Sequence, residues 1–284
     1  MLSRILVPVR GDGMGEVVLS HAAMLAHRHK AHIIVAHCRS QPEEMIPYSV
    51  PLPAFMRKTI IEQASELSDQ EEDGLREKLH EVARKLDLLE TDNPDGSTAS
   101  LQFVEETGRM MDVVRHNGRL VDLIVVAKPD RDRNLGTNTL KAGIFMTGRP
   151  VLMCPPDLDP PPDFGKRIAV AWNGSLEAAR TVMVTRDLAE AAEEVTILSG
   201  GAGQPHGATT EELLAYYQLR GVRAKIHRFD ARNPGAALLE KTREVGAHLL
   251  MMGAYSVSHE RETLLGGNTQ AVVDNADMPV VMAH

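Results

Sequence analysis

The sequence has few of the features that mark nucleic-acid-binding, membrane-spanning or secreted proteins. Aromatic residues make up 4% of its 284 residues and the formal net charge is −8, whereas nucleic-acid-binding surfaces need clustered basic residues and aromatic stacking platforms. No apolar run approaches the roughly 20 residues of a membrane span, and the start of the chain does not resemble a secretory signal. We therefore expect a cytoplasmic protein with no nucleic-acid or membrane partner.

Cysteine is also scarce, and no motif for catalysis or metal binding is present. Cys38 and Cys154 are the only cysteines, each at the end of an expected strand, which favours buried reduced thiols over a disulfide or redox pair. The 12 histidines form no His-Glu-x-x-His motif, and the sequence contains no Gly-x-Ser-x-Gly motif. No metal ligand and no catalytic residue can be nominated from these patterns.

What the sequence does contain is an internal repeat. Residues 3–11 and 165–174 each consist of a short apolar strand followed by a turn, and each half closes on a strand after a proline, Pro150 or Pro279. The two openings, aligned at Arg4 and Arg167, lie 163 positions apart and the two closing prolines 129, so the first copy carries 34 extra residues. A repeat of this size predicts two copies of one domain.

The repeat and the prolines give the expected domain boundaries. We expect a first domain at 1–154, a second at 165–284, and a proline-rich linker at 155–164 that favours an extended connection over packed structure. Most of the extra residues of the first copy fall in a charged, helix-compatible segment at 55–89. This segment either packs on its own sheet or the sister domain, or binds a partner.

Hydrophobic patterning predicts alternating strands and helices in both copies. Continuous apolar runs predict strands buried on both faces, at 5–9, 32–37, 101–104, 123–126 and 151–153, and again at 168–171, 195–199, 224–228, 248–252 and 280–282. Helical spacing predicts helices at 15–28, 109–117, 176–191, 209–219, 234–244 and 269–275. This alternation predicts an α/β fold with parallel sheets and helices on both faces.

The loop after the fourth strand of the second copy is the candidate ligand site. It leaves the sheet at Gly253 and returns to a helix through Gly266, Gly267, Asn268 and Thr269. Glycines let the backbone approach a ligand closely, and the free amides of a helix start suit a phosphate. The same residues are also compatible with a purely structural connection.

Here the sequence resembles the tandem, two-domain form of the universal stress protein family. The family's nucleotide motif is Gly, two residues, Gly, nine residues, then Gly and Ser or Thr. Gly253 and Gly266 have its outer spacing, while Ser256 replaces the middle glycine and Gly267 the Ser or Thr. The segment 171–175, Ala-Trp-Asn-Gly-Ser, and the loop ending Leu-Gly-Gly-Asn-Thr at 265–269 resemble one subgroup of the family.

The resemblance implies two Rossmann-like domains, each with a five-stranded parallel sheet of strand order 3-2-1-4-5. It implies pairing through the last strands within the chain, a homodimer as a further option, and binding of ATP or a related adenine nucleotide, with or without Mg²⁺. Family members that bind nucleotide usually have Asp at the position of Asn173. The implied site in the second copy comprises Ala171, Asn173, Met252, Gly253, Ser256, Arg261, Gly266, Gly267, Asn268 and Thr269.

The first copy departs further from the motif. Arg10 stands at the acidic position, Ala127 replaces the opening glycine, and Gly136 follows only nine residues later. A helix start at Gly136 and Thr137 keeps a place for an anion, but we expect the second copy to be the better nucleotide site.

Three functions remain open from the sequence. The leading one is a stress-response protein in which the nucleotide is regulatory rather than catalytic. The second is a slow ATPase, for which only His259, Glu260, Arg261 and Glu262 lie near enough to act on a phosphate. The third is a scaffold that binds no nucleotide, or a tandem stress protein that binds another small ligand.

Overall fold

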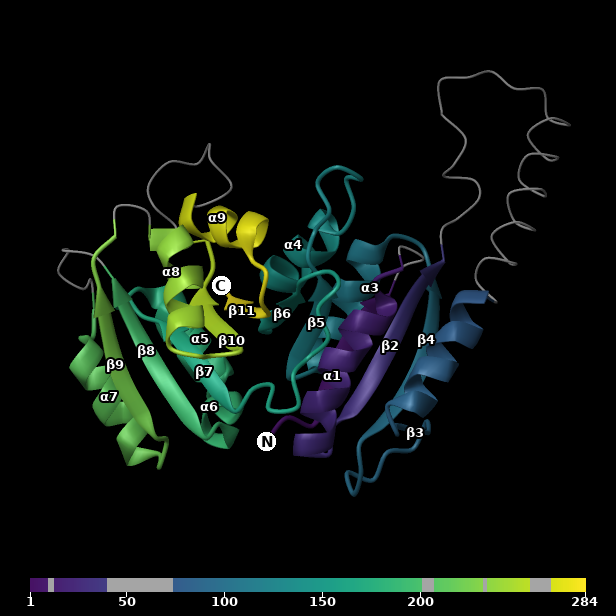
Figure 1. Ribbon diagram of the computed structural model, residues 1–284. Helices are drawn as coiled ribbons and strands as arrows, with labels where there is room; N and C mark the ends of the chain where they lie inside the picture. Colours follow the sequence, from purple (N-terminus) through teal and green to yellow (C-terminus); the bar gives the residue numbers. More distant parts are fainter. Residues whose placement is uncertain (10–12, 40–73, 201–206, 232–233, 256–266) are drawn as a thin grey trace, which may run out of the picture.

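The computed structural model describes residues 1–9, 13–39, 74–200, 207–231, 234–255 and 267–284. Across these residues, eleven strands form one continuous sheet in the order β3-β4-β2-β1-β5-β6-β11-β10-β7-β8-β9, with helices on both faces (Figure 1). The chain is thus an α/β protein, as the alternating pattern predicts.

The N-terminal half contributes six parallel strands. They are β1 (Arg4–Val9), β2 (His32–Arg39), β3 (Leu89–Glu90), β4 (Ser100–Thr107), β5 (Leu123–Ala127) and β6 (Val151–Cys154). Apart from β3, a two-residue edge strand that the sequence does not predict, the strands have the expected order 3-2-1-4-5.

The C-terminal half repeats this order without the extra strand. Its strands are β7 (Arg167–Ala171), β8 (Glu194–Gly200), β9 (Ala224–Phe229), β10 (Leu249–Gly253) and β11 (Val280–Ala283). All neighbours within this half pair in parallel. The predicted strands are one to four residues shorter than, or shifted by one from, those observed.

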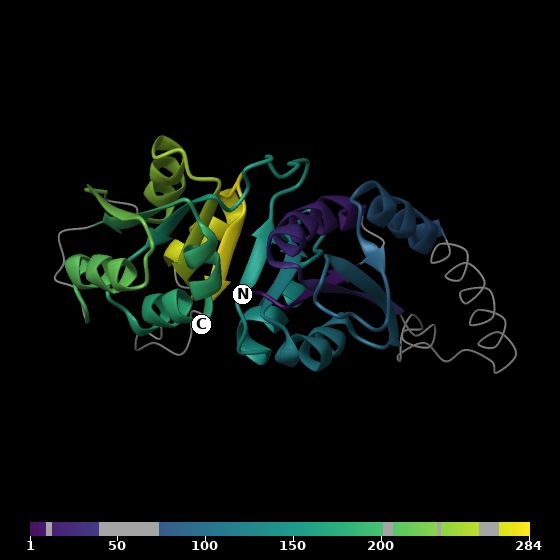
Figure 2. The ribbon, with the colours of Figure 1, turned by 90° about the horizontal axis from the view of Figure 1, so that it is seen from below.

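The two halves meet through their last strands. β6 pairs with β11, and the two strands lie side by side at the centre of the sheet (Figure 2). The pairing is antiparallel, with Leu152 opposite Val281. This is the pairing within the chain that the resemblance implies, and it joins both halves into one sheet.

Helices cover both faces of this sheet. They are α1 (Gly15–His29), α3 (Met110–Asn117), α4 (Thr137–Met146), α5 (Leu176–Val184), α6 (Arg186–Ala191), α7 (Thr210–Leu219), α8 (Pro234–Glu244) and α9 (Gly267–Asn275). Neighbouring strand residues alternate between two core layers, Val7 lying in one and Leu6 in the other. Both layers contain residues of both halves, so the core is continuous across the β6–β11 junction.

The helix expected at 176–191 is divided in two. α5 ends at Val184 and α6 begins at Arg186. Between them, the Thr185 hydroxyl donates to the Thr181 carbonyl at 2.6 Å. Such a bond back to the preceding turn competes with the helical ladder and bends helices, which accounts for the break.

The linker ends in packed structure, which corrects the expectation of a purely extended connection. Phe164 is fully buried, and its ring meets the His21 ring edge-on at 5.1 Å. Its carbonyl accepts a hydrogen bond from Arg28 Nη2 at 2.6 Å. The linker is therefore anchored to α1 of the N-terminal half.

The described part of the 55–89 segment packs on its own half. Residues 74–85 are helical, and Leu79, Val82 and Ala83 are buried in the core layer that also contains α1. Residues 55–73 lie outside the described part of the chain.

Both cysteines are present as thiols, and burial raises the pKa of the Cys154 thiol. Within the described residues, no helix is long and apolar enough to cross a membrane.

The packing of His21 predicts a pH-dependent stability. Burial lowers the pKa of His21 below 6.5, while Nδ1 lies 2.8 Å from the Val17 carbonyl and holds the proton of the neutral ring. The unfolded chain therefore binds a proton first as the pH falls, so the free energy of unfolding should decrease below pH 6.5. We expect His21→Gln to lose less stability than the wild type between pH 7 and pH 5 in urea unfolding.

The control is His116→Gln, because the His116 side chain is 77% exposed. This variant should keep the wild-type pH dependence. Equal slopes for His21→Gln and the wild type would show that the buried imidazole does not titrate as described.

Candidate functional site

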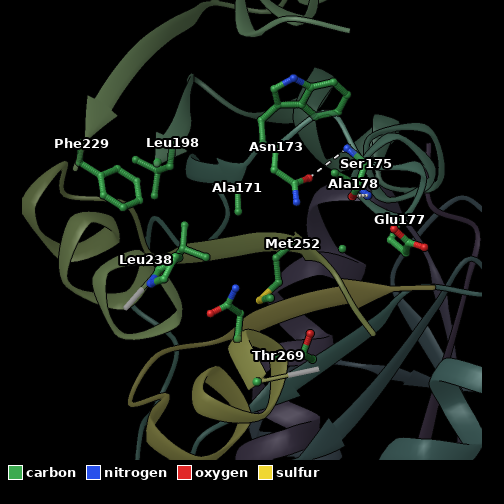
Figure 3. A pocket seen from close by; sticks show the side chains of 16 residues that line it. Ala171, Asn173, Ser175, Glu177, Ala178, Leu198, Phe229, Leu238, Met252 and Thr269 are labelled. Carbon is green, nitrogen blue, oxygen red and sulfur yellow. Dashed lines mark hydrogen bonds between the residues drawn. The ribbon is translucent and has the colours of Figure 1, made fainter. Parts of the chain in front are cut away.

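A cavity of about 290 Å³ opens at the carboxyl edge of the C-terminal half (Figure 3). It lies where β7 and β10 are neighbours but their following segments leave in opposite directions, the usual ligand position in an open parallel sheet. Its described lining consists of Ala171, Trp172, Asn173, Ser175, Glu177, Ala178, Leu198, Gly200, Phe229, Pro234, Leu238, Met252, Gly253, Gly267, Asn268 and Thr269.

One wall of the cavity is apolar. The side chains of Leu198, Phe229 and Leu238 come from β8, β9 and α8, and those of Ala171 and Met252 continue the wall toward β7 and β10 (Figure 3). Such a surface suits a flat apolar group, for instance a heterocyclic base, because burying it removes apolar area from water.

The rest of the cavity is bordered by helix starts. The first turns of α5, α8 and α9 all contribute lining residues. The first amides of a helix have no partner within the helix and carry the positive end of its dipole. In α5 the Ser175 hydroxyl accepts from the Ala178 amide at 3.2 Å. At α9, Gly267 and Asn268 are exposed. The polar side of the cavity therefore favours an anion.

Asn173 offers the cavity a donor rather than an acceptor. Its Oδ1 accepts a hydrogen bond from the Ser175 amide at 3.1 Å. Only the oxygen of the side-chain amide can accept, so the NH₂ group is the end turned toward the cavity (Figure 3). The role implied by the resemblance, a carbonyl acceptor for a ribose hydroxyl, is thus partly taken by the protein's own backbone.

Gly253 and Thr269 also have structural partners. A Cβ at Gly253 would lie 2.6 Å from the Ala178 nitrogen and 2.7 Å from the Glu177 carbonyl carbon. The glycine therefore lets β10 pack closely against the start of α5. The Thr269 hydroxyl accepts from the Tyr255 amide at 3.1 Å, which fixes the first turn of α9 to the end of β10.

The structure brings most of the sequence-predicted residues together. The cavity is lined by Ala171, Asn173, Met252, Gly253, Gly267, Asn268 and Thr269, whereas Ser256, Arg261 and Gly266 lie outside the described residues. Sequence reasoning missed the apolar wall and Trp172, whose indole donates to the Ala208 carbonyl at 3.0 Å. The signal that could have found the wall is the position of Leu198 and Phe229 at strand ends.

The described lining carries a single ionisable side chain, Glu177, which is 7% exposed. Among the described residues no group of three His, Cys, Asp or Glu side chains could hold a metal ion. The Arg10 position of the first copy and the four loop residues considered for an ATPase, at 259–262, also fall outside the described parts.

The corresponding place in the N-terminal half is almost filled. Its described residues enclose about 20 Å³, room for little more than one water. The following loop folds on itself, since the backbones of Asp130 and Leu135 exchange hydrogen bonds of 3.0 and 2.9 Å. A Cβ at Gly136 would lie 3.1 Å from Pro129 Cα. The two copies therefore differ in the space they offer a ligand.

The contacts of Gly253 generate a stability prediction. We expect Gly253→Ala to lower the free energy of unfolding by about 1–3 kcal/mol, because its methyl group would overlap backbone atoms that cannot rotate away. Gly267→Ala is the matched control, since a Cβ there meets nothing within 4 Å, and it should change stability by less than about 0.5 kcal/mol. Urea unfolding of both variants measures the difference; equal values would contradict the packing argument.

Comparison with known proteins agrees with this architecture. Residues 165–284 match the model of the universal stress protein family. A universal stress protein from Archaeoglobus fulgidus is 14% identical, with 99% of this chain and 95% of that chain covered and a TM-score of 0.66. A protein of unknown function from Pseudomonas aeruginosa is 16% identical, with 99% and 92% covered and a TM-score of 0.55.

A universal stress protein whose structure contains cAMP is 24% identical, with 42% of this chain and 96% of that chain covered and a TM-score of 0.36. No curated protein is significantly similar in sequence. Residues 165–284 are therefore similar to the universal stress protein family, and over its whole length the chain has the fold of a universal stress protein of tandem size.

Proposed function

We propose that this protein is a universal stress protein that binds an adenine nucleotide, ATP or a close relative, in its C-terminal half, and that the nucleotide regulates rather than undergoes reaction. The observation that carries the proposal is the cavity of about 290 Å³, which combines an apolar wall with helix starts at the point where the strand order reverses. The corresponding place in the N-terminal half encloses about 20 Å³, which supports one nucleotide site per chain.

The two sides of the cavity suit the two ends of a nucleotide. The base would lie against Leu198, Phe229 and Leu238, and the phosphates would accept hydrogen bonds from the first amides of α9 at Gly267 and Asn268. The volume is at the small end for ligand pockets, so the phosphates would extend toward solvent. Any Mg²⁺ would be held chiefly by phosphate oxygens and water, with Glu177 as the single carboxylate within the described lining.

A regulatory role is favoured over hydrolysis by the chemistry of the lining. Phosphoryl transfer needs a positioned base or water together with positive charge on the phosphates. In the described lining Glu177 is the one ionisable side chain, and a carboxyl group supplies no positive charge. A scaffold without nucleotide is disfavoured because the C-terminal cavity stays open while its N-terminal counterpart is filled.

We further propose that the chain consists of two universal stress protein domains, 1–154 and 165–284, joined at 155–164. The repeated strand order and the family match that begins at residue 165 support this division. Both cysteines are thiols rather than a disulfide, which supports a reducing compartment such as the cytoplasm.

The test of nucleotide binding uses Asn268→Asp. An acidic residue in the first turn stabilises a helix, so the variant should fold, yet its carboxylate would repel a phosphate at the same amides. We expect ATP affinity to fall at least about tenfold, a difference of 1.4 kcal/mol, and adenosine affinity to stay within about twofold. Trp172, the only tryptophan, lines the cavity and reports binding by fluorescence, with calorimetry as the second measurement.

The control is Asn173→Asp, which adds the same charge on the other side of the cavity. One carboxylate oxygen would keep the bond from the Ser175 amide and the other would face the ribose, so ATP affinity should not fall. Lack of ATP binding by the wild type would overturn the proposed function. Equal weakening by both variants would mean that net charge, and not the α9 amides, governs affinity.

A further inference from the structure

The loop that follows β5 in the N-terminal half reaches across to the C-terminal half. The Lys128 ammonium donates a hydrogen bond to the Ala276 carbonyl at 2.9 Å. The Arg131 guanidinium lies 2.7 Å from Asp274 Oδ1. Both acceptors lie at the end of α9, the helix whose first turn lines the cavity.

A second contact between the halves is made by α4, the helix that follows this loop. The Phe145 ring of α4 lies 5.1 Å from the Tyr255 ring and 5.1 Å from the His284 ring. Tyr255 has a positive φ of 56° and its amide donates to the Thr269 hydroxyl. α4 and α9 accordingly face one another across the β6–β11 junction (Figure 1). The N-terminal half thus contacts the chain before α9, at Tyr255, and after it, at Ala276 and His284.

The loop that makes the first contact occupies the place of a phosphate loop. It follows the fourth strand of its half, as the segment after Gly253 does in the other half. The mutual hydrogen bonds of Asp130 and Leu135 close it on itself. Lys128 and Arg131, which in such a position would be candidates to bind phosphate, are directed to α9 instead.

Lys128 is the stronger of the two polar contacts. The Arg131 side chain is 62% exposed, and exposed ion pairs contribute little. Lys128 is half-buried. Burial lowers its pKa, whereas the negative charges of Asp274 and Asp277 act to raise it. An ammonium at the carbonyl end of a helix is also favoured by the helix dipole.

α9 is short, and contacts near its two ends fix its direction together with the buried side chains of Val272 and Val273. Its nine residues span about 13 Å at 1.5 Å per residue. Near its start, Gly235 of α8 approaches so closely that a Cβ would lie 2.8 Å from the Asn268 carbonyl oxygen. Its far end is held by Lys128 of the other half. We therefore expect loss of the Lys128 contact to let the first turn of α9 tilt relative to the cavity.

We propose that Lys128, Arg131 and Phe145 form a cross-half clamp, a set of positioning residues that holds α9 in the orientation the ligand cavity requires. The N-terminal half, with its own cavity filled, thereby supports the binding site of the C-terminal half. The effect on affinity rests on the proposed nucleotide function, whereas the effect on α9 itself does not.

The experiment compares Lys128→Met and Phe145→Ala in the full-length protein. Each should weaken ATP binding, followed by Trp172 fluorescence, about fivefold to tenfold, within the range of coupling between distant sites. Each should also accelerate amide hydrogen exchange in peptides covering 267–275 without ligand. Phe145→Ala changes no charge, so a shared effect excludes long-range attraction between Lys128 and the phosphates.

Lys225→Met is the matched control, because it removes a 2.7 Å pair with Glu194 at the opposite edge of the C-terminal sheet. It should leave both ATP affinity and α9 exchange unchanged. Lys128→Arg keeps a cationic donor for the Ala276 carbonyl and should recover most of the affinity.

The outcomes separate the clamp from the nucleotide function. If the wild type binds ATP and both clamp variants match it in affinity and in α9 exchange, the clamp is overturned. If the wild type binds no ATP, the nucleotide function fails, and exchange alone decides: faster exchange of α9 in the clamp variants but not in Lys225→Met supports the clamp, and unchanged exchange refutes it. If Lys128→Met does not fold, Phe145→Ala and Asp274→Asn give the same comparison.

Discussion

The antiparallel pairing of β6 with β11 is the constraint on which the rest of the structure depends. Leu152 and Val281, which face each other in this pair, are fully buried. A strand edge buried without partners would leave backbone donors and acceptors unsatisfied, so each half supplies the strand that completes the other. The same pairing makes the two core layers continuous and brings the loop after β5 to the end of α9.

Duplication within one chain lets the two copies diverge. In a symmetric pair of identical subunits, any residue that closed one cavity would close both. Here Lys128 and Gly136 belong to a loop that packs, while Gly267 and Asn268 border a cavity. The copy with the filled cavity contributes Lys128 to a contact with its sister, so a loop that departs from the nucleotide motif has a structural role.

The order of strands and helices could be predicted because apolar runs such as 5–9 and 168–171 fit only strands buried on both faces. β3, the break at Thr185 and the burial of Phe164 could not, since each depends on contacts with distant or competing groups. In the site, glycine spacing predicts the α9 side. Leu198 and Phe229 line the cavity because of the order of the strands in the sheet, which the spacing of a motif does not predict.

The asparagine at position 173 determines which hydrogen-bonding groups of a ligand this end of the cavity can bind. The turn before α5 needs an acceptor for the Ser175 amide, and the side-chain oxygen supplies it. A carboxylate there would still have a second oxygen for a ribose hydroxyl, whereas asparagine turns its NH₂ group to the same space. In the proposed complex, this end would bind acceptor groups of the ligand, and the apolar wall and the helix starts would provide most of the binding free energy. Affinity would then depend on how firmly α9 is held, and the Lys128 contact that holds it comes from the half whose corresponding cavity is filled.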